Sequence, residues 1–141
     1  LRVRFIGDLT KLDEKLKAAI AELTEYSSQF TGLTLTIAIN YGSRDEMTRA
    51  IKSLAKDVKE DKISVDDINE YLFSSYLDTK EIPDPDFMIR TSGEQRLSNY
   101  LLWQIAYSEI LVVDEFWPEF GKKSLANAIE EFHNRQRRFG K

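Results

Sequence analysis

The chain has 141 residues and a formal net charge of -4, with a pI near 5.1. That length suits a single domain, and the acidic balance argues against nucleic acid as a main partner. The absence of cysteine excludes disulfides, thiolate zinc sites and a cysteine nucleophile. No apolar run reaches the ~20 residues that a membrane-spanning helix needs, and no signal peptide is visible, so we expect a cytoplasmic protein without a transmembrane segment.

The first third of the chain alternates strand and helix patterns. Residues 1–6 alternate apolar and charged side chains, which predicts a strand ending at Gly7 and Asp8. Residues 11–26 repeat apolar side chains at helical spacing and predict an amphipathic helix. The nearly continuous apolar and threonine run 33–39 is typical of a strand covered on both faces.

A polar turn follows that second strand. It contains Asn40, Tyr41, Gly42, Ser43 and Arg44, and Glu46 stands three residues after the serine. This spacing predicts a capping box at the start of the next helix, with Ser43 as the N-cap. A strand, a glycine turn and a helix N-terminus together are a common way to present backbone amides to an anion, although a purely structural turn is the alternative.

The second half continues the alternation. We expect a short helix capped at Ser64 and ending near residue 72, a strand at 87–89 after Pro83 and Pro85, a helix at 99–106, a strand at 110–113 and a last helix at 122–138. Strands alternating with helices predict an α/β fold with a parallel sheet flanked by helices. Ligands of such sheets bind at the carboxyl ends of the strands, where Asp8, residues 40–44 and residues 90–98 would gather.

Two arginines in an acidic region are the first candidate binding residues. Residues 81–120 contain eight carboxylates and only two cations, Arg90 and Arg96. Guanidinium groups match phosphate oxygens in a bidentate geometry, and Ser92, Ser98 and the turn amides near Gly93 could add neutral donors. A downstream carboxylate could hold magnesium against the same phosphate. The alternative is that both arginines only neutralise neighbouring acids.

The segment around these arginines carries a family resemblance. Residues 87–109 read FMIRTSGEQRLSNYLLWQIAYSE. This segment closely resembles the signature of the cis-prenyltransferases, and in particular of bacterial members that make undecaprenyl diphosphate, a lipid carrier for cell-wall synthesis. The turn at residues 40–44, with a serine where a second glycine is more usual, and the Trp-Pro-x-Phe run at residues 117–120 also resemble this family. The likeness extends over almost the whole chain.

The resemblance implies an activity and a site. It implies condensation of isopentenyl diphosphate with an allylic diphosphate such as farnesyl diphosphate, repeated with cis geometry. By the same likeness Arg90, Arg96 and Ser98 would hold isopentenyl diphosphate, Glu94 would orient the arginines, and Glu109 would bind Mg²⁺. Asn40 is also a candidate substrate-binding residue.

The end of the chain resembles the Arg-x-Gly tail of dimeric cis-prenyltransferases, with Arg138 and Gly140 reaching a diphosphate across the subunit interface. The resemblance therefore implies a homodimer, which its lipid product could bring to the membrane surface.

The resemblance also implies that something is missing. Cis-prenyltransferases carry an Asp-Gly-Asn-Gly-Arg segment near the N-terminus whose aspartate binds magnesium and the allylic diphosphate, and this sequence contains no such segment. We therefore expect residues 1–141 to be the C-terminal portion of one catalytic domain, an incomplete copy of the fold that is inactive alone. One alternative is a non-catalytic partner subunit of a heteromeric cis-prenyltransferase; another is a generic phosphate-binding α/β module.

Overall fold

A computed structural model describes residues 1–135, which divide into two compact units, Leu1–Pro83 and the part that begins at Asp84. Each unit contains one two-stranded parallel sheet among the described residues. The α/β class and the parallel strand pairing that the sequence predicts are therefore confirmed. None of the helices in residues 1–135 is long and apolar enough to cross a membrane.

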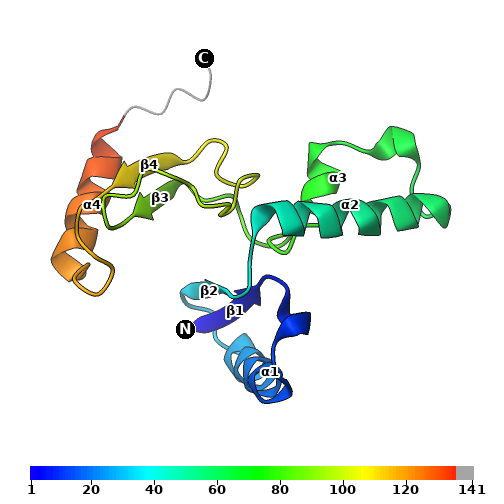
Figure 1. The fold of residues 1–141 in the computed structure, drawn as a ribbon, viewed down its shortest axis with the longest axis horizontal. Helices are drawn as coiled ribbons and strands as arrows, with labels where there is room; N and C mark the ends of the chain where they lie inside the picture. Colours follow the sequence, from blue (N-terminus) through cyan, green and yellow to red (C-terminus); the bar gives the residue numbers. More distant parts are fainter. Residues whose placement is uncertain (136–141) are drawn as a thin grey trace. The chain divides into compact units, whose positions relative to one another are not determined.

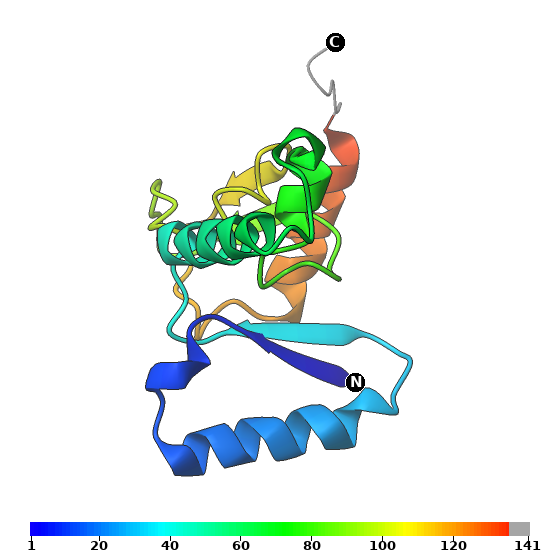
Figure 2. The same cartoon turned by 90° about the vertical axis from the view of Figure 1, so that its right-hand side faces the viewer.

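In the first unit, strand β1 (Arg2–Ile6) pairs with β2 (Thr34–Ala38), and helix α1 (Glu14–Ser28) packs against β1. Figure 2 shows α1 running along this pair of strands. Asp13 accepts the amide of Leu16 and so caps α1, which begins three residues later than the sequence predicts because a 3₁₀ turn (Leu9–Lys11) comes first. At the other end of α1 the buried Ser27 hydroxyl accepts the Val3 N–H at 3.0 Å.

Helix α2 (Ser43–Lys59) follows β2, and its N-cap is Gly42 without a side-chain cap. The predicted capping box at Ser43 is therefore wrong, because Ser43 is the first helical residue and is fully buried. The predicted helix at 64–72 is two pieces, a 3₁₀ turn (Val65–Asp67) with a capping box from Ser64, and α3 (Glu70–Ser74) capped by Asn69.

In the second unit, β3 (Phe87–Arg90) pairs in parallel with β4 (Glu109–Val112), and α4 (Lys122–Asn134) lies against these strands (Figure 1). The rings of Phe87 and Phe132 are 4.9 Å apart and join β3 to α4. The predicted helix at 99–106 is wrong: the chain makes successive turns there, because Asn99 and Leu101 have φ of 62° and 46°. A right-handed helix cannot pass through left-handed residues.

Burial is lower than the apolar pattern predicts. Leu33 and Leu35 are 78% and 44% exposed, so the expectation that β2 is covered on both faces is wrong for residues 1–135. The buried apolar side chains of the first unit come from β1, from α1 and α2, and from Leu77 after α3. Those of the second unit are Ile105 and Ala128.

Candidate functional site

The candidate site of the second unit lies on one face of the β3–β4 pair. Side chains alternate between the faces of a strand, so Met88 and Arg90 share a face. Together with Ile110 and Val112 from β4 they line a pocket of about 320 Å³. The loop after β3 supplies the rest of its lining: Glu94, Gln95, Arg96 and Leu97. The two arginines that the sequence singles out thus share one pocket.

Arg90 is held in this pocket with an unused donor. Its Nη2 donates to the Ser98 hydroxyl at 3.4 Å, a long contact. Its Nε is buried and has no hydrogen-bond partner among the described residues. A buried donor without an acceptor costs about 1–3 kcal/mol. Arg90 has no ion-pair partner among residues 1–135, so the idea that it merely neutralises a neighbouring acid does not hold for the described residues, and its guanidinium remains available to an anion in the pocket.

Arg96 behaves differently. It forms a close ion pair with Glu94, and its side chain is 68% exposed while that of Glu94 is 35% exposed. The neutralising alternative therefore describes Arg96 in this structure. Both residues line the pocket, so the pair stands at its rim beside Arg90. An exposed ion pair contributes little to stability, and an anionic ligand could compete for Arg96 at low cost.

The loop after β3 has unusual backbone conformations, and two of its amides are held by hydrogen bonds. Ser92 and Ser98 both have positive φ, 68° and 51°. The amide of Ser92 donates to the Glu115 carbonyl at 2.8 Å, and that of Gly93 to the Val113 carbonyl at 2.9 Å. These two turn amides are therefore occupied, and the expectation that they add donors for an anion is wrong in this structure.

Glu109 does not line the pocket of the arginines. Its Oε2 accepts from Arg135 Nη1 at 3.1 Å, and Arg135 also donates to Glu131 at 2.5 Å. Within residues 1–135 no group of three or more acidic or histidine side chains gathers where it could hold a metal ion. The expected meeting of Glu109 with Arg90 and Arg96 is therefore not observed among the described residues.

Asn40 belongs to the first unit, where it joins the ends of β1 and β2. Its Nδ2 donates to the Asp8 carbonyl at 2.8 Å, and the Asp8 amide donates to the Asn40 carbonyl at 3.2 Å. The predicted gathering of the first two strand ends is thus confirmed. Hydrogen bonds from Thr10 and Lys11 lower the pKa of the Asp8 carboxyl to about 2. Arg138 and Gly140 lie outside the described residues.

A polar cluster in the first unit was not predicted from the sequence. Arg49 donates from Nη1 and Nη2 to the two carboxylate oxygens of Asp78 at 2.8 and 2.7 Å. Asp78 also accepts the Gly7 amide at 3.0 Å, and its own amide donates to the buried Glu46 at 2.9 Å. Tyr41 donates to the same glutamate at 2.6 Å. The only local sign was Glu46 on the apolar side of a helix.

Comparison with known proteins gives a consistent picture. Residues 1–140 match the family model described as "Putative undecaprenyl diphosphate synthase". The chain is 52% identical over 140 residues to an isoprenyl transferase of Agrobacterium fabrum, covering 99% of this chain and 57% of that protein. It is 47% identical to a ditrans,polycis-undecaprenyl-diphosphate synthase of Micrococcus luteus, named as (2E,6E)-farnesyl-diphosphate specific, of which it covers 56%. The chain thus spans little more than half the length of these relatives.

A solved structure is similar as well. The crystal structure of lavandulyl diphosphate synthase from Lavandula x intermedia, in complex with dimethylallyl diphosphate, superposes with a TM-score of 0.95 at 34% identity. The match covers 99% of this chain and 60% of that one. The fold of the described residues is therefore a partial copy of a larger α/β fold.

Proposed function

Because the chain belongs to the undecaprenyl diphosphate synthase family, we propose that it is part of an isoprenyl transferase that joins isopentenyl diphosphate to an allylic diphosphate. Repeated cis condensation onto farnesyl diphosphate would give undecaprenyl diphosphate. The starter and product are those named for the Micrococcus luteus relative. The observation that carries the proposal is the shared pocket of Arg90 and Arg96.

The pocket suits a small molecule with a diphosphate and a short hydrocarbon group. The Arg90 guanidinium and the Ser98 hydroxyl offer donors for phosphate oxygens, and charge-assisted hydrogen bonds from a guanidinium are the strong ones. The remaining walls are largely apolar: Met88, Leu97, Ile110 and Val112. The five-carbon group of isopentenyl diphosphate could rest on these side chains, which would also keep water from the reacting carbons.

The ion pair between Arg96 and Glu94 would change when a diphosphate binds. In this structure Glu94 neutralises Arg96 at the rim of the pocket. A diphosphate offers Arg96 a more highly charged partner, and Glu94 then keeps the guanidinium oriented. In this proposal Arg90 is available to the diphosphate at all times, whereas Arg96 first has to leave Glu94. Replacement of Arg90 should therefore weaken diphosphate binding more than replacement of Arg96.

The proposed role of magnesium rests only on the family resemblance. When bound, it would neutralise charge on the departing diphosphate. Glu109 remains the predicted ligand, and the Arg135 contact would have to open for the carboxylate to reach a metal ion. Within residues 1–135, no group of three or more acidic or histidine side chains surrounds one position.

Binding of isopentenyl diphosphate tests the site directly. We expect calorimetric titration to show binding to this chain and an affinity about 10–100-fold weaker in Arg90→Ala, since a hydrogen bond to a charged group contributes about 1.5–3 kcal/mol. Lys123→Ala is the matched control, because Lys123 is an exposed cation of the same unit that does not line the pocket. Equal weakening in both variants would show that the chain attracts isopentenyl diphosphate only through the general charge of its cationic side chains, without a specific site at Arg90.

We also propose that this chain binds isopentenyl diphosphate without completing the condensation alone. Its relatives extend well beyond the matched region. By the family resemblance, the allylic diphosphate is bound by an Asp-Gly-Asn-Gly-Arg segment that this sequence does not contain. Incubation with labelled isopentenyl diphosphate, farnesyl diphosphate and Mg²⁺ should give no labelled polyprenyl product. Product formation by the purified chain would overturn this part of the proposal.

The proposed homodimer rests on the tail with Arg138 and Gly140, outside the described residues. Sedimentation equilibrium of the chain and of a variant ending at residue 134 tests it. We expect the shorter variant to dimerise less, and equal association of both would contradict the role of the tail.

A further inference from the structure

The first unit has a strand edge whose backbone groups lack partners within residues 1–135. At the start of the β1–β2 pair the Arg2 amide donates to the Leu33 carbonyl at 2.9 Å. At its end the Ile39 amide donates to the Ile6 carbonyl, also at 2.9 Å. The odd-numbered residues of this segment therefore direct their backbone groups toward β1. The even-numbered residues of β2 direct theirs to the outer edge: Thr34, Thr36 and Ala38. None of these outward amides and carbonyls has a hydrogen-bond partner within residues 1–135.

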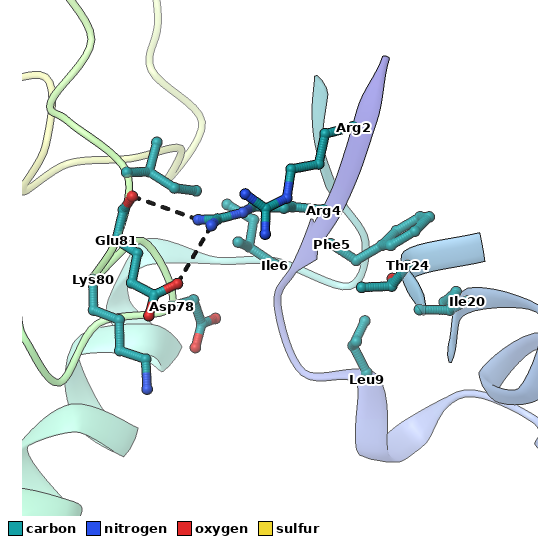
Figure 3. A pocket seen from close by; sticks show the side chains of 11 residues that line it. Arg2, Arg4, Phe5, Ile6, Leu9, Ile20, Thr24, Asp78, Lys80 and Glu81 are labelled. Atoms are coloured by element: carbon teal, nitrogen blue, oxygen red, sulfur yellow. Dashed lines mark hydrogen bonds and ion pairs between the residues drawn. The ribbon is translucent and has the colours of Figure 1, made fainter. Parts of the chain in front are cut away.

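The opposite edge of the same sheet, on β1, is closed at Val3 by α1. The Val3 amide donates to the Ser27 hydroxyl at 3.0 Å, and that hydroxyl lies 3.4 Å from the Val3 carbonyl. Figure 3 shows Phe5 of β1 on the side of Thr24 from α1, and Arg4 on the other side of the strand. An edge strand invites pairing with another chain unless it is covered or charged. β1 is therefore protected at this point, and β2 is the strand of this sheet that remains available.

The sequence of the β2 edge contains none of the residues that usually protect such an edge. Residues 33–39 read LTLTIAI, without a charged side chain or a proline. Leu33 and Leu35 are 78% and 44% exposed, so apolar side chains lie beside the open backbone. A two-stranded sheet is marginal by itself, and three or more strands are normally needed for stability. This edge therefore combines unpartnered backbone groups, exposed apolar side chains and a sheet that gains from further strands.

We propose that the outer edge of β2 pairs antiparallel with the same edge of a second copy of this chain, about a two-fold axis at Thr36. A two-fold contact uses the same surface on both copies, and it is the commonest symmetry of homo-oligomers. With Thr36 opposite Thr36, the outward backbone groups of the two strands exchange hydrogen bonds, and all of residues 33–39 find a partner. The two sheets then become one sheet of four strands in the order β1–β2–β2–β1.

The side chains match in this arrangement. Leu35 lies opposite Ile37 of the second copy, and Leu33 lies opposite Ile39 in the same way. These positions do not exchange backbone hydrogen bonds, so their Cα atoms approach to about 4.5 Å and their side chains pack closely. The other face pairs threonine with threonine or alanine. No like charges meet along this edge, although each copy carries a net charge of -4. A second copy is therefore an occupant that the edge fits without change.

Disulfide cross-linking tests the proposed register on the full chain. The chain contains no cysteine, so an introduced thiol is the only one. In the paired dimer the two Cα atoms at position 36 lie about 5.5 Å apart, within the span of a disulfide. The two copies of Thr34 lie four residues out of register, roughly 14 Å apart, which a disulfide cannot bridge. With oxidised glutathione, Thr36→Cys should therefore form disulfide-linked dimers at least tenfold faster than the matched Thr34→Cys.

A charge placed at the two-fold axis tests the association itself. Sedimentation equilibrium should show dimers at micromolar concentrations, because a single strand edge is a small interface. Thr36→Lys should weaken this association about tenfold, since the two lysines face each other across the edge. Ala19→Lys is the matched control, because it adds the same charge at an exposed position of α1, and it should associate like the wild type. Circular dichroism checks that both variants keep the fold.

The same measurements separate this edge from the proposed contact through the tail. The Thr36→Cys cross-link should form equally well in the variant that ends at residue 134, because the edge does not involve the tail. Equal cross-linking of Thr36→Cys and Thr34→Cys would overturn the proposal. So would an association of the variant ending at residue 134 that Thr36→Lys leaves unchanged, or a full chain that stays monomeric at high micromolar concentrations.

Discussion

The substitution Asp78→Asn tests whether the polar cluster holds the first unit together. Asp78 joins three parts of that unit, since it accepts from Arg49 on α2 and from the Gly7 amide after β1, and its own amide donates to Glu46. The amide of asparagine has nearly the same shape but carries no charge. It would also turn an N–H donor toward the donors of Arg49 or Gly7, leaving at least one of them unsatisfied.

The expected cost follows from these contacts. Removal of one partner of a fully buried ion pair costs about 3–5 kcal/mol. The side chains of Arg49 and Asp78 are 36% and 18% exposed, so water recovers part of that loss. We expect the free energy of unfolding to fall by about 2–3 kcal/mol, because one to two charge-assisted hydrogen bonds disappear. For a chain of this length that corresponds to a melting temperature roughly 5–10 °C lower.

The pH dependence supplies a second readout. Hydrogen bonds from Arg49 hold the pKa of Asp78 below its ordinary value, against the opposing effect of burial. A group whose pKa is lowered in the folded state stabilises the protein above its unfolded pKa of about 3.9 and loses that contribution as pH falls through the folded value. The stability difference between wild type and Asp78→Asn should therefore be full at pH 7 and shrink below about pH 4.

Urea and thermal unfolding, followed by circular dichroism between pH 3 and pH 7, measure both effects. Asp66→Asn is the control, because Asp66 is an exposed carboxylate of the same unit without an ion-pair partner that the structure records, and it should change stability by less than about 0.5 kcal/mol. Wild-type stability of Asp78→Asn at pH 7, or a loss that stays constant down to pH 3, would refute the reasoning.

Two further substitutions test the backbone. Gly7→Ala should lower the free energy of unfolding by more than about 2 kcal/mol in urea titrations, because Gly7 has φ of 113° and an added Cβ would lie 2.1 Å from the Ile39 carbonyl oxygen. A loss below about 0.5 kcal/mol, which is typical of a surface substitution, would contradict this geometry. Asp61→Gly should raise stability by about 0.5–1 kcal/mol, since Asp61 follows the end of α2 with φ of 55° and glycine adopts that conformation without strain; unchanged or lower thermal stability would argue against a strained position.

Local patterns predicted the regular elements well. The alternation of residues 1–6 and the apolar run before Asn40 became a parallel pair, and the family segment became β3 with its loop. The pattern failed at residues 99–106, where apolar spacing suits a helix but positive φ at Asn99 and Leu101 prevents one. Such backbone conformations are imposed by contacts outside the segment, which the local sequence does not contain.

The sequence predicted only part of the candidate site, because local patterns do not show contacts between distant segments. Arg90 and Arg96 are six residues apart around a single loop, so their shared pocket followed from the strand and its exit. The partners of Glu109 and Asp78 are 26 and 29 residues away in sequence, and no local periodicity indicates such pairs. Burial was overestimated at positions such as Leu33 and Leu35, 78% and 44% exposed, because a two-stranded sheet covers little surface.

The most direct measurement of the central claim is a crystal structure of this chain with isopentenyl diphosphate. We predict that a diphosphate oxygen lies about 2.7–3.2 Å from a guanidinium nitrogen of Arg90, with Ser98 and Arg96 contacting the same group. A diphosphate bound elsewhere, or an Arg90 guanidinium that makes no hydrogen bond to the diphosphate, would contradict the assignment of this pocket.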